Sequence, residues 1–205
     1  MEEFNRKSHW ENIYTTKALN EVSWYQEKPE TSISFLNSVS IRKDAAIIDV
    51  GGGDSFFVDY LLQEGFTNVT VLDISEAAIK RAKLRLGEQA SKVSWVVSDV
   101  TKFTPTMKFD FWHDRAAFHF LTDLTEIKRY KETVYNSMSL NGDVVIGTFS
   151  KTGPLKCSGI EITQYAQSDL IQLFSDFKFI SGVDLVHNTP FDTTQNFVFC
   201  HFKNG

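Results

Sequence analysis

Three consecutive glycines, Gly51, Gly52 and Gly53, stand between an apolar run, 45–50, and the first turns of a predicted helix, 55–65. Glycine lets the backbone adopt positive φ angles and approach a ligand closely, while the following helix presents free N–H groups. In open α/β sheets, ligands bind beyond the carboxyl ends of the strands, usually at the first strand and helix. The loop therefore indicates both a fold class and the place of a binding site.

Strand-like and helical segments alternate through the middle of the chain. Helices placed between strands indicate crossover units and a parallel sheet. The strand-like runs are 45–50, 69–74, 93–100, 109–113 and 143–149, and the helical ones are 55–65, 75–87 and 123–140.

The two ends of the chain depart from this alternation. Helices are predicted over 4–17, over 29–39 and within 158–176. The runs 177–186 and 195–202 are joined by a connection too short for a parallel crossover, so we expect them to pair antiparallel. The predicted fold is α/β: a Rossmann-like, doubly wound, mostly parallel seven-stranded sheet that ends in an antiparallel hairpin.

The length of 205 residues suits one domain with a substantial core. We expect a single domain over 1–205, made of an N-terminal helical cover (1–42), a cofactor-binding core (43–150) and an acceptor-side part with a loop, a helix and the terminal hairpin (151–205). The loop 151–165 is long for a plain connection and is expected to cover the acceptor.

Charge and hydropathy exclude several classes of partner. A formal net charge of -5 gives no general attraction to phosphate backbones, so no nucleic-acid partner is expected. The apolar runs are far shorter than the roughly 20 residues of a membrane span, and the first residues lack the apolar core of a secretory signal. We expect a cytoplasmic protein with no membrane partner, either a monomer or a weak dimer. Cys157 and Cys200 lack metal-ligand spacing, which predicts reduced thiols and no metal.

Carboxylates end the first three predicted strands at Asp49, Asp73 and Asp99. Asp73 lies where a carboxylate accepts hydrogen bonds from ribose hydroxyls, and Asp99 is placed to accept from an adenine amino group. Strands often end in Asp because turns do, so each residue alone has a structural explanation. Together with the glycine loop, the three indicate an adenosine-containing ligand.

A nicotinamide dinucleotide fits this loop poorly. The G-x-G-x-x-G fingerprint requires glycine at the position of Phe56. Asp49 would also place a carboxylate beside a pyrophosphate, which is unfavourable. A cationic ligand suits Asp49 better, and S-adenosylmethionine carries an ammonium and a sulfonium group and no phosphate. A nicotinamide oxidoreductase is thus the least favoured alternative.

The sequence here resembles the class I S-adenosylmethionine-dependent methyltransferases. "IIDVGGGDS" is similar to that family's acidic-x-Gly-x-Gly-x-Gly loop, with Ser55 in place of the last glycine, and "VTVLDIS", "VVSDV" and "LNGD" match its later landmarks. The resemblance implies an enzyme that uses S-adenosylmethionine and releases S-adenosylhomocysteine. It implies that Asp73 holds the ribose and that Asp99 with Val100 contacts adenine. The predicted cofactor residues are Asp49, Gly51, Gly52, Gly53, Ser55, Asp73, Ile74, Asp99, Val100 and His113.

The stretch "FDFWHDRAAFHFL", 109–121, contains the fourth strand, whose tip lies under the transferring methyl group in this family. Asp114 and Arg115 are similar to the aspartate-arginine pair of the thiopurine S-methyltransferase branch, where the arginine faces the substrate. "IYTTKALNEVSWYQ" also resembles that branch's N-terminal cover. Protein lysine methyltransferases carry an Asp-Lys-Gly element at the same place, so Asp114 alone does not choose between the groups.

The candidate catalytic residues are Asp114, Arg115 and His119, and each has a structural alternative. Asp114 could act as a general base or simply bind Arg115. Arg115 could anchor an anionic substrate, and His119 could take a proton near neutral pH or be a structural histidine. The candidate substrate-side residues are all aromatic: Trp10, Tyr14, Trp24, Tyr25 and Phe118.

The sequence predicts a methyltransferase that acts on a small molecule, with a thiol as one candidate, because the chain has no added domain for recognising a macromolecule. A protein lysine N-methyltransferase is the first alternative and should show an open acidic groove. A non-catalytic S-adenosylmethionine-binding protein is the second. In that protein, side chains such as Trp112 or Phe118 would fill the space beside the methyl group.

Overall fold

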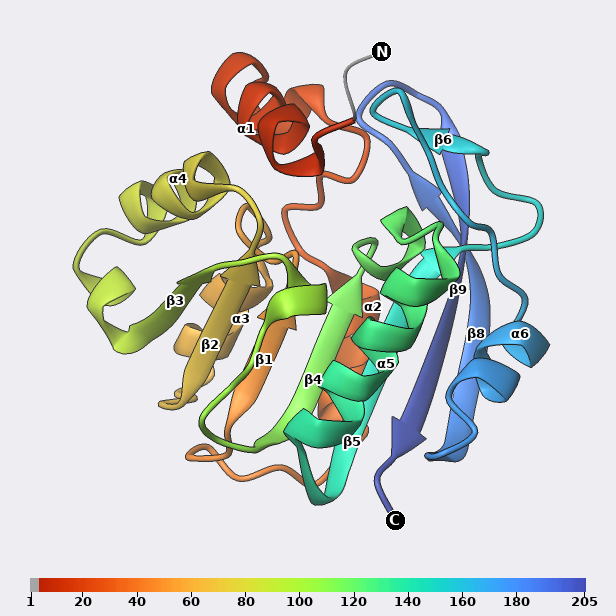
Figure 1. The fold of residues 1–205 in the computed structure, drawn as a ribbon. Coiled ribbons are helices and arrows are strands. Elements are labelled where there is room, and N and C mark those ends of the chain that lie inside the picture. The colour runs from red at the N-terminus through yellow and green to blue at the C-terminus, as the bar shows by residue number, and fades with distance from the viewer. Residues whose placement is uncertain (1–3) are drawn as a thin grey trace.

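The computed structural model describes residues 4–205 and contains a central seven-stranded sheet in the order β3-β2-β1-β4-β5-β9-β8 (Figure 1). Strands β1 to β5 are parallel, whereas β9 runs antiparallel to both β5 and β8. The predicted fold class is therefore confirmed. The strands are β1 (Ile47–Val50), β2 (Val69–Asp73), β3 (Val93–Val97), β4 (Phe109–Arg115), β5 (Met138–Phe149), β8 (Lys178–Asn188) and β9 (Thr194–Lys203).

Helices cover both faces of this sheet. Helix α5 packs on one face, and α2 and α3 pack on the other (Figure 1). Helix α1 lies above the carboxyl ends of the parallel strands, on the side of α4. The helices are α1 (Arg6–Thr16), α2 (Glu30–Asn37), α3 (Phe57–Gln63), α4 (Glu76–Leu86), α5 (Leu124–Ser137) and α6 (Gln167–Leu173).

The alternation of side chains along β4 divides the core in two. Phe111 faces the cluster that contains Leu36 of α2 and Leu61 of α3. Trp112 faces the cluster that contains Tyr130 of α5. Because neighbouring strand residues point to opposite faces, His113 and Asp114 must also face apart. This alternation decides which groups of β4 reach the ligand side.

Two predicted elements differ in extent. The helix expected over 123–140 ends at Ser137, because Met138 adopts an extended conformation and begins β5. The helix expected within 158–176 is confined to α6. A small hairpin of β6 (Lys156–Cys157) and β7 (Ile160–Glu161) takes the preceding residues, turned by Ser158 and Gly159 at positive φ.

Within residues 4–205, none of the helices is long and apolar enough to cross a bilayer.

Candidate active site

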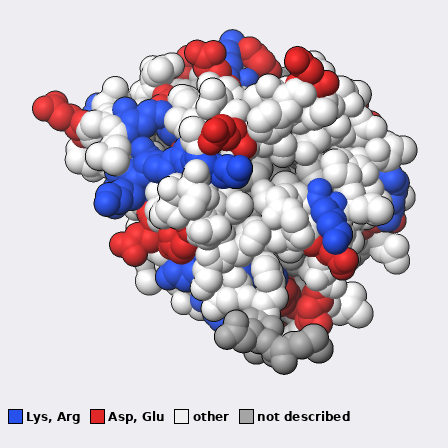
Figure 2. Space-filling view, turned by 90° about the horizontal axis from the view of Figure 1, so that it is seen from above, with Lys and Arg blue, Asp and Glu red and all other residues white. Residues whose placement is uncertain are grey.

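A cavity is lined by residues at the carboxyl ends of β1, β2 and β4 and by residues of α1 and the segment that follows it. Helix α1 lies above these strand ends (Figure 1). Figure 2 shows this end of the molecule from above, with Lys and Arg side chains gathered on the side of α4 and a large uncharged surface beside them. Of the ten predicted cofactor residues, all except Gly53 line the cavity: Asp49, Gly51, Gly52, Ser55, Asp73, Ile74, Asp99, Val100 and His113.

The glycine loop closes tightly over the end of β1. Gly51 has a φ of +68°, a left-handed conformation that glycine adopts at no steric cost. A Cβ atom added to Gly52 would overlap the carboxylate of Asp49. Side chains are thus excluded from this loop by its own geometry, before any ligand is considered.

Asp49 belongs to a buried polar chain that crosses from β1 through β4 to α2. His113 Nδ1 lies 2.6 Å from Asp49 Oδ1, and His113 Nε2 lies 2.8 Å from Ser32 Oγ. The second oxygen, Asp49 Oδ2, is buried and has no hydrogen-bond partner among the described residues. A buried acceptor without a donor is costly, so this wall of the cavity suits a cationic donor such as the ammonium group of S-adenosylmethionine.

The other two strand-end carboxylates are held by local backbone donors. Asp73 accepts hydrogen bonds from the N–H groups of Gly53 (3.0 Å) and Ser75 (2.8 Å), and burial raises the pKa of its carboxyl to about 6. Asp99 accepts from the backbone N–H and the hydroxyl of Thr101, at 2.9 and 2.8 Å. Each carboxylate is therefore fixed in place with lone pairs left to receive ligand hydroxyl or amino groups.

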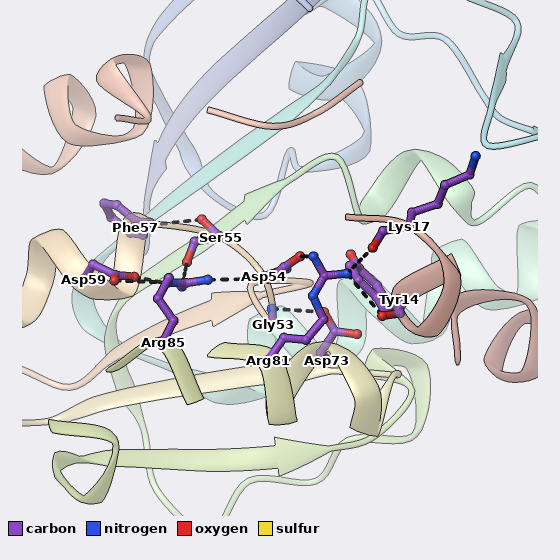
Figure 3. A network of polar contacts seen from close by, with 10 residues as sticks. All are labelled: Tyr14, Lys17, Gly53, Asp54, Ser55, Phe57, Asp59, Asp73, Arg81 and Arg85. Carbon is purple, nitrogen blue, oxygen red and sulfur yellow. Dashed lines mark hydrogen bonds and ion pairs between the residues drawn. The ribbon is translucent and has the colours of Figure 1, made fainter. Parts of the chain in front are cut away.

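Two arginines of α4 bind the residue that follows the glycines, and one of them, Arg81, also binds helix α1 (Figure 3). Asp54, whose pKa is raised to about 6 by burial, lies 3.1 Å from Arg81 Nη2 and 3.4 Å from Arg85 Nη1. Arg81 Nη1 also donates to the carbonyl oxygens of Tyr14 and Lys17, where α1 ends. One guanidinium group thus links the ligand loop to the helix that covers it.

Helix α1 makes the reciprocal contact with α4. The Glu11 carboxylate accepts hydrogen bonds from the N–H groups of Glu76 and Ala77 and from the Ser75 hydroxyl, at 2.7 to 3.0 Å. A carboxylate at a helix N-terminus satisfies free N–H groups and interacts favourably with the helix dipole. Helix α1 is therefore attached to α4 at two places: Glu11 binds the N-terminus of α4, and Arg81 binds the C-terminus of α1.

The part of the cavity that the sequence predicts to receive the acceptor, which we call the acceptor end, is mainly aromatic. The ring centroid of Trp10 lies 5.6 Å from that of Trp24 and 4.9 Å from that of Phe120. The predicted substrate-side residues Trp10, Tyr14, Trp24 and Tyr25 all line the cavity, and so does Cys157 of the loop 151–165 that is expected to cover the acceptor. Three further aromatic residues, which the sequence did not single out there, also line it: Phe120, Phe149 and Phe197.

Phe118 is the exception among the predicted substrate-side residues. It is fully buried on the opposite face of the sheet, where its ring packs against Tyr130, Tyr165 and Phe174. The prediction that it faces the substrate is wrong. Trp112 is buried in the same cluster, so neither side chain fills the space that the non-catalytic alternative required.

Asp114 does not line the cavity and does not bind Arg115, because it lies on the other face of β4 from His113. It accepts hydrogen bonds from the Tyr130 hydroxyl (2.6 Å) and from the N–H groups of Ala117 and Phe118. These bonds hold the turn after β4, where Ala116 has a φ of +66°. Burial raises the pKa of Asp114 to about 6. The structure therefore gives Asp114 a structural position instead of that of a base.

His119 is also withdrawn from the cavity. It is fully buried between the rings of Phe120 and Phe149, and burial lowers the pKa of its imidazole to about 3. Its Nδ1 accepts a hydrogen bond from the Phe149 N–H. The predicted role as a proton acceptor at neutral pH is not supported by this position.

Arg115 is the candidate catalytic residue that does line the cavity. Its guanidinium donates to Gln26 Oε1 at 2.6 Å and to the carbonyl oxygen of Trp24 at 2.9 Å. Both acceptors are neutral. Burial lowers the pKa of Arg115 to about 10, so the group remains a cation at neutral pH.

Sequence reasoning missed several residues of the site. Arg6, Gln26 and Asp54 line the cavity, and Ser32 binds His113. Asp54 directly follows the glycine loop, a position that could have drawn attention to it. The other three come from distant segments with no local motif, so only their placement in space identifies them.

Comparisons with known proteins agree with this geometry. Residues 47–142 match the family described as "Methyltransferase domain". The "EEF1A lysine methyltransferase 2" of Danio rerio is 26% identical over 94% of this chain and 80% of that protein.

Two solved structures superpose over most of both chains. One, from work on the conversion of a disulfide bond into a thioacetal group during echinomycin biosynthesis, has a TM-score of 0.79, with 16% identity over 97% of this chain and 92% of that one. The other, the N-methyltransferase NodS from Bradyrhizobium japonicum WM9 in complex with S-adenosylhomocysteine, has a TM-score of 0.73, with 16% identity over 98% and 99%.

The sheet order, the glycine loop and the cavity above it define the class I methyltransferase fold. The chain therefore carries a methyltransferase domain in the class I fold, and these comparisons support an enzyme that uses S-adenosylmethionine as its cofactor. The resemblance to this family that the sequence showed is thereby confirmed. The narrower resemblance to the thiopurine S-methyltransferase branch stays a prediction.

Proposed function

We propose that the enzyme methylates a small, largely apolar molecule that carries a thiol or an anionic group. The observation that carries this proposal is the acceptor end of the cavity, whose lining includes Arg115 together with the aromatic residues Trp24, Phe149 and Phe197. Arg115 forms hydrogen bonds with neutral acceptors and no ion pair among the described residues, and the Asp49 carboxylate acts on it only through space, so its charge is available to attract an anionic group of the substrate.

The cofactor residues have separate roles in this proposal. Asp49 Oδ2 accepts from the ammonium group, Asp73 from the ribose hydroxyls and Asp99 from the adenine amino group, with Ile74 and Val100 packing beside them. Bound S-adenosylmethionine supplies an electrophilic methyl group on a sulfonium. The aromatic walls exclude water, hold the acceptor in line with that methyl group and favour a cation beside their faces.

The choice of acceptor follows from the positions of the titratable groups. Asp114 and His119 lie outside the cavity lining, and His113 is already bound to Asp49 and Ser32. A thiolate needs no protein base, and a nearby guanidinium favours the ionised form of a thiol. These features support a thiol acceptor and make the predicted acid-base roles unnecessary.

Methylation of a protein lysine is the second candidate, favoured by the similarity to EEF1A lysine methyltransferase 2 along nearly the whole chain. Two features of the acceptor end speak against it. The Arg115 cation repels a lysine ammonium group, and the acidic residues of the described cavity lining, Asp49, Asp54, Asp73 and Asp99, surround the predicted cofactor site.

The division of one domain into a cover (1–42), a cofactor core (43–150) and an acceptor part (151–205) belongs to this proposal. It is supported by the cavity lining, to which the first part contributes Trp10 and Trp24, the second Asp49, and the third Cys157.

A labelled-methyl transfer screen tests the substrate class. The panel contains aromatic and aliphatic thiols, carboxylates and amines, and beside them a purified elongation factor 1A. We expect transfer to an apolar thiol or an anionic apolar molecule, and none to the protein. Transfer to a lysine of the elongation factor alone would overturn the small-molecule assignment. The Asp73→Ala variant, which should bind the cofactor weakly, controls for non-enzymatic labelling.

A further inference from the structure

Residues 22–26, which we call the strap, cross the acceptor end of the cavity between a short 3-10 turn (Leu19–Glu21) and α2. Val22, Trp24, Tyr25 and Gln26 of the strap line the cavity. The strap contains neither helix nor strand. Its position therefore depends on contacts made by side chains from other parts of the chain.

Two side chains, from β4 and from β8, each bind both the backbone of the strap and the Gln26 amide. Arg115 of β4 donates to Gln26 Oε1 and to the Trp24 carbonyl, at 2.6 and 2.9 Å. His187 of β8 lies with Nε2 2.8 Å from the Ser23 carbonyl oxygen and with Nδ1 3.1 Å from Gln26 Nε2. The side-chain amide of Gln26 thus joins Arg115 to His187.

The protons in this chain of contacts have one consistent arrangement. A guanidinium only donates, so the Gln26 carbonyl oxygen must face Arg115 and its NH2 group must face His187. His187 Nδ1 must then accept, which places the imidazole proton on Nε2, where it donates to the Ser23 carbonyl. The arrangement requires a neutral imidazole and a fixed orientation of the Gln26 amide.

We propose that Gln26 is a positioning residue of this methyltransferase, whose amide links Arg115 to His187 and so holds the strap closed over the bound cofactor and acceptor. The strap would control access to the cavity in the same way for either class of acceptor. Trp24 and Tyr25 occupy the cavity wall only while the strap is held, so Gln26 acts through them and not on the reacting atoms.

A dependence on pH follows from the same geometry. When His187 is protonated, its Nδ1 carries a hydrogen, so two donors, Nδ1–H and the Gln26 NH2 group, face each other. If the Gln26 amide turns over to avoid this, its NH2 group faces the Arg115 guanidinium, which is also a donor. Burial and the Arg115 charge lower the pKa of His187, while the bond to Ser23 opposes this shift. The strap should therefore be held at neutral pH and released in acid.

The surroundings of His187 contain further titratable and charged groups. Tyr25, Glu27 and Lys28 line a shallow groove on its outer side. The ring of Phe197 on β9 packs against it at 6.0 Å, and Gln195 on β9 donates to the Ser23 hydroxyl at 3.1 Å. Arg115 is the charged group on the cavity side. The opposite charges of Glu27 and Lys28 partly offset each other.

The exchange of S-adenosylhomocysteine, followed by stopped-flow fluorescence, tests the proposal. In the Gln26→Ala variant we expect dissociation about tenfold faster at neutral pH, because a hydrogen bond to a charged group and one to an imidazole are lost together. Thermal unfolding checks that the variant is folded. A folded variant with the exchange rate of the wild-type enzyme would overturn the proposal.

The Gln26→Glu variant separates positioning from a merely structural role. A carboxylate accepts from Arg115 and also from a protonated His187, so this strap should be held better in acid than at neutral pH. Between about pH 8 and about pH 5.5, dissociation should accelerate in the wild-type enzyme and slow in the variant. Asp54 and Asp73, whose pKa values are about 6, titrate in both proteins. The contrast between the two profiles therefore reports the Gln26 contacts.

The matched control is Gln172→Glu, the same chemical change at an exposed position of α6. It should reproduce the wild-type pH profile. Parallel profiles for wild-type and Gln26→Glu proteins would show that the strap is not held through the Gln26 amide, even if methyl transfer to a small molecule were established.

Discussion

The two ends of the cavity are built in different ways. At the cofactor end, Asp73 and Asp99 are fixed by backbone N–H groups only two residues further along the chain, at Ser75 and Thr101. At the acceptor end, Gln26 is fixed by Arg115 and His187, which lie 89 and 161 residues away. Local turns contribute to the first end, where the Gly53 N–H and His113 add longer-range bonds to Asp73 and Asp49, whereas Gln26 is held, among the described residues, only by distant segments.

This difference teaches where the enzyme is rigid and where it can move. Local hydrogen bonds form with the strand ends themselves and remain while the sheet is folded. The strap can lose its side-chain contacts without unfolding the sheet, because its backbone forms no part of it. A methyltransferase needs both properties, since it must hold one common cofactor and admit and release its substrate.

The largest expected effect lies at the cofactor end. Gly52→Ala should weaken S-adenosylhomocysteine binding about a hundredfold, because the new Cβ overlaps the Asp49 carboxylate and overpacking costs about 1–3 kcal/mol. Isothermal calorimetry measures this loss. Gly65→Ala is the control: its Cβ meets open space, although its φ of +82° costs stability, so affinity should be retained. Unchanged affinity in Gly52→Ala would contradict the view that the cofactor end of the cavity is rigid.

The next effect belongs to the acceptor end. Arg115→Ala should lower methyl transfer to the identified acceptor about fiftyfold and weaken S-adenosylhomocysteine binding about tenfold, since Arg115 loses both its contacts to the strap and its attraction for the acceptor but does not bind the strand-end carboxylates. Steady-state kinetics and calorimetry check the two values. Arg42→Ala, at an exposed arginine paired with Asp44, should change neither. Equal losses of binding and turnover would place Arg115 in the cofactor site.

Asp114→Asn sharpens the comparison by testing a buried carboxylate that lies at neither end. We expect methyl transfer at neutral pH to stay within about threefold of wild type, because the residue holds a turn and does not line the cavity. A loss approaching a thousandfold would restore Asp114 as a catalytic base.

The same variant has a defined effect on the free energy of unfolding. The pKa of Asp114 is raised to about 6 in the folded protein, so its contribution to stability is present below about pH 4 and lost as the pH rises through about 6. As the pH rises from about 4 to about 6, the wild-type protein should therefore lose up to about 3 kcal/mol of unfolding free energy relative to the asparagine variant. Urea unfolding at both ends of the range measures it, with exposed Asp44→Asn as control. A constant difference would contradict the raised pKa.

The smallest effect is expected where α1 meets α5. Arg6 Nη2 lies 2.7 Å from Glu126, and Arg6 Nη1 lies 3.8 Å from Asp99. Partly exposed ion pairs contribute little, so Arg6→Ala should cost less than about 1 kcal/mol of stability and about twofold in cofactor affinity. A double-mutant cycle with Glu126→Ala measures the coupling. If Arg6→Ala weakened cofactor binding as much as Gly52→Ala does, α1 would have to be counted with the rigid cofactor end of the cavity.

Most of the cofactor end could be predicted from the sequence, because its residues follow strands in a regular order. The glycine loop, Asp73 and Asp99 are each found at the end of an apolar run, and nine of the ten predicted residues line the cavity. The roles of Asp114 and Phe118 could not be predicted in the same way. Their neighbours on β4 and in the following turn reach the cavity, and only the alternation and the turn geometry show which side chains face away from it.

By itself, the sequence determined the alternation of strands and helices, the antiparallel terminal hairpin and the carboxylates at the strand ends, because these depend on hydrophobic periodicity and local turn chemistry. Only the tertiary structure decided that Glu11 and Arg81 dock α1 on α4, and that Arg115 and His187 meet at Gln26. These contacts join residues far apart in the chain. Which residues meet in these contacts depends on how the packed sheet brings distant segments together. A local pattern of residues along the chain does not contain that information.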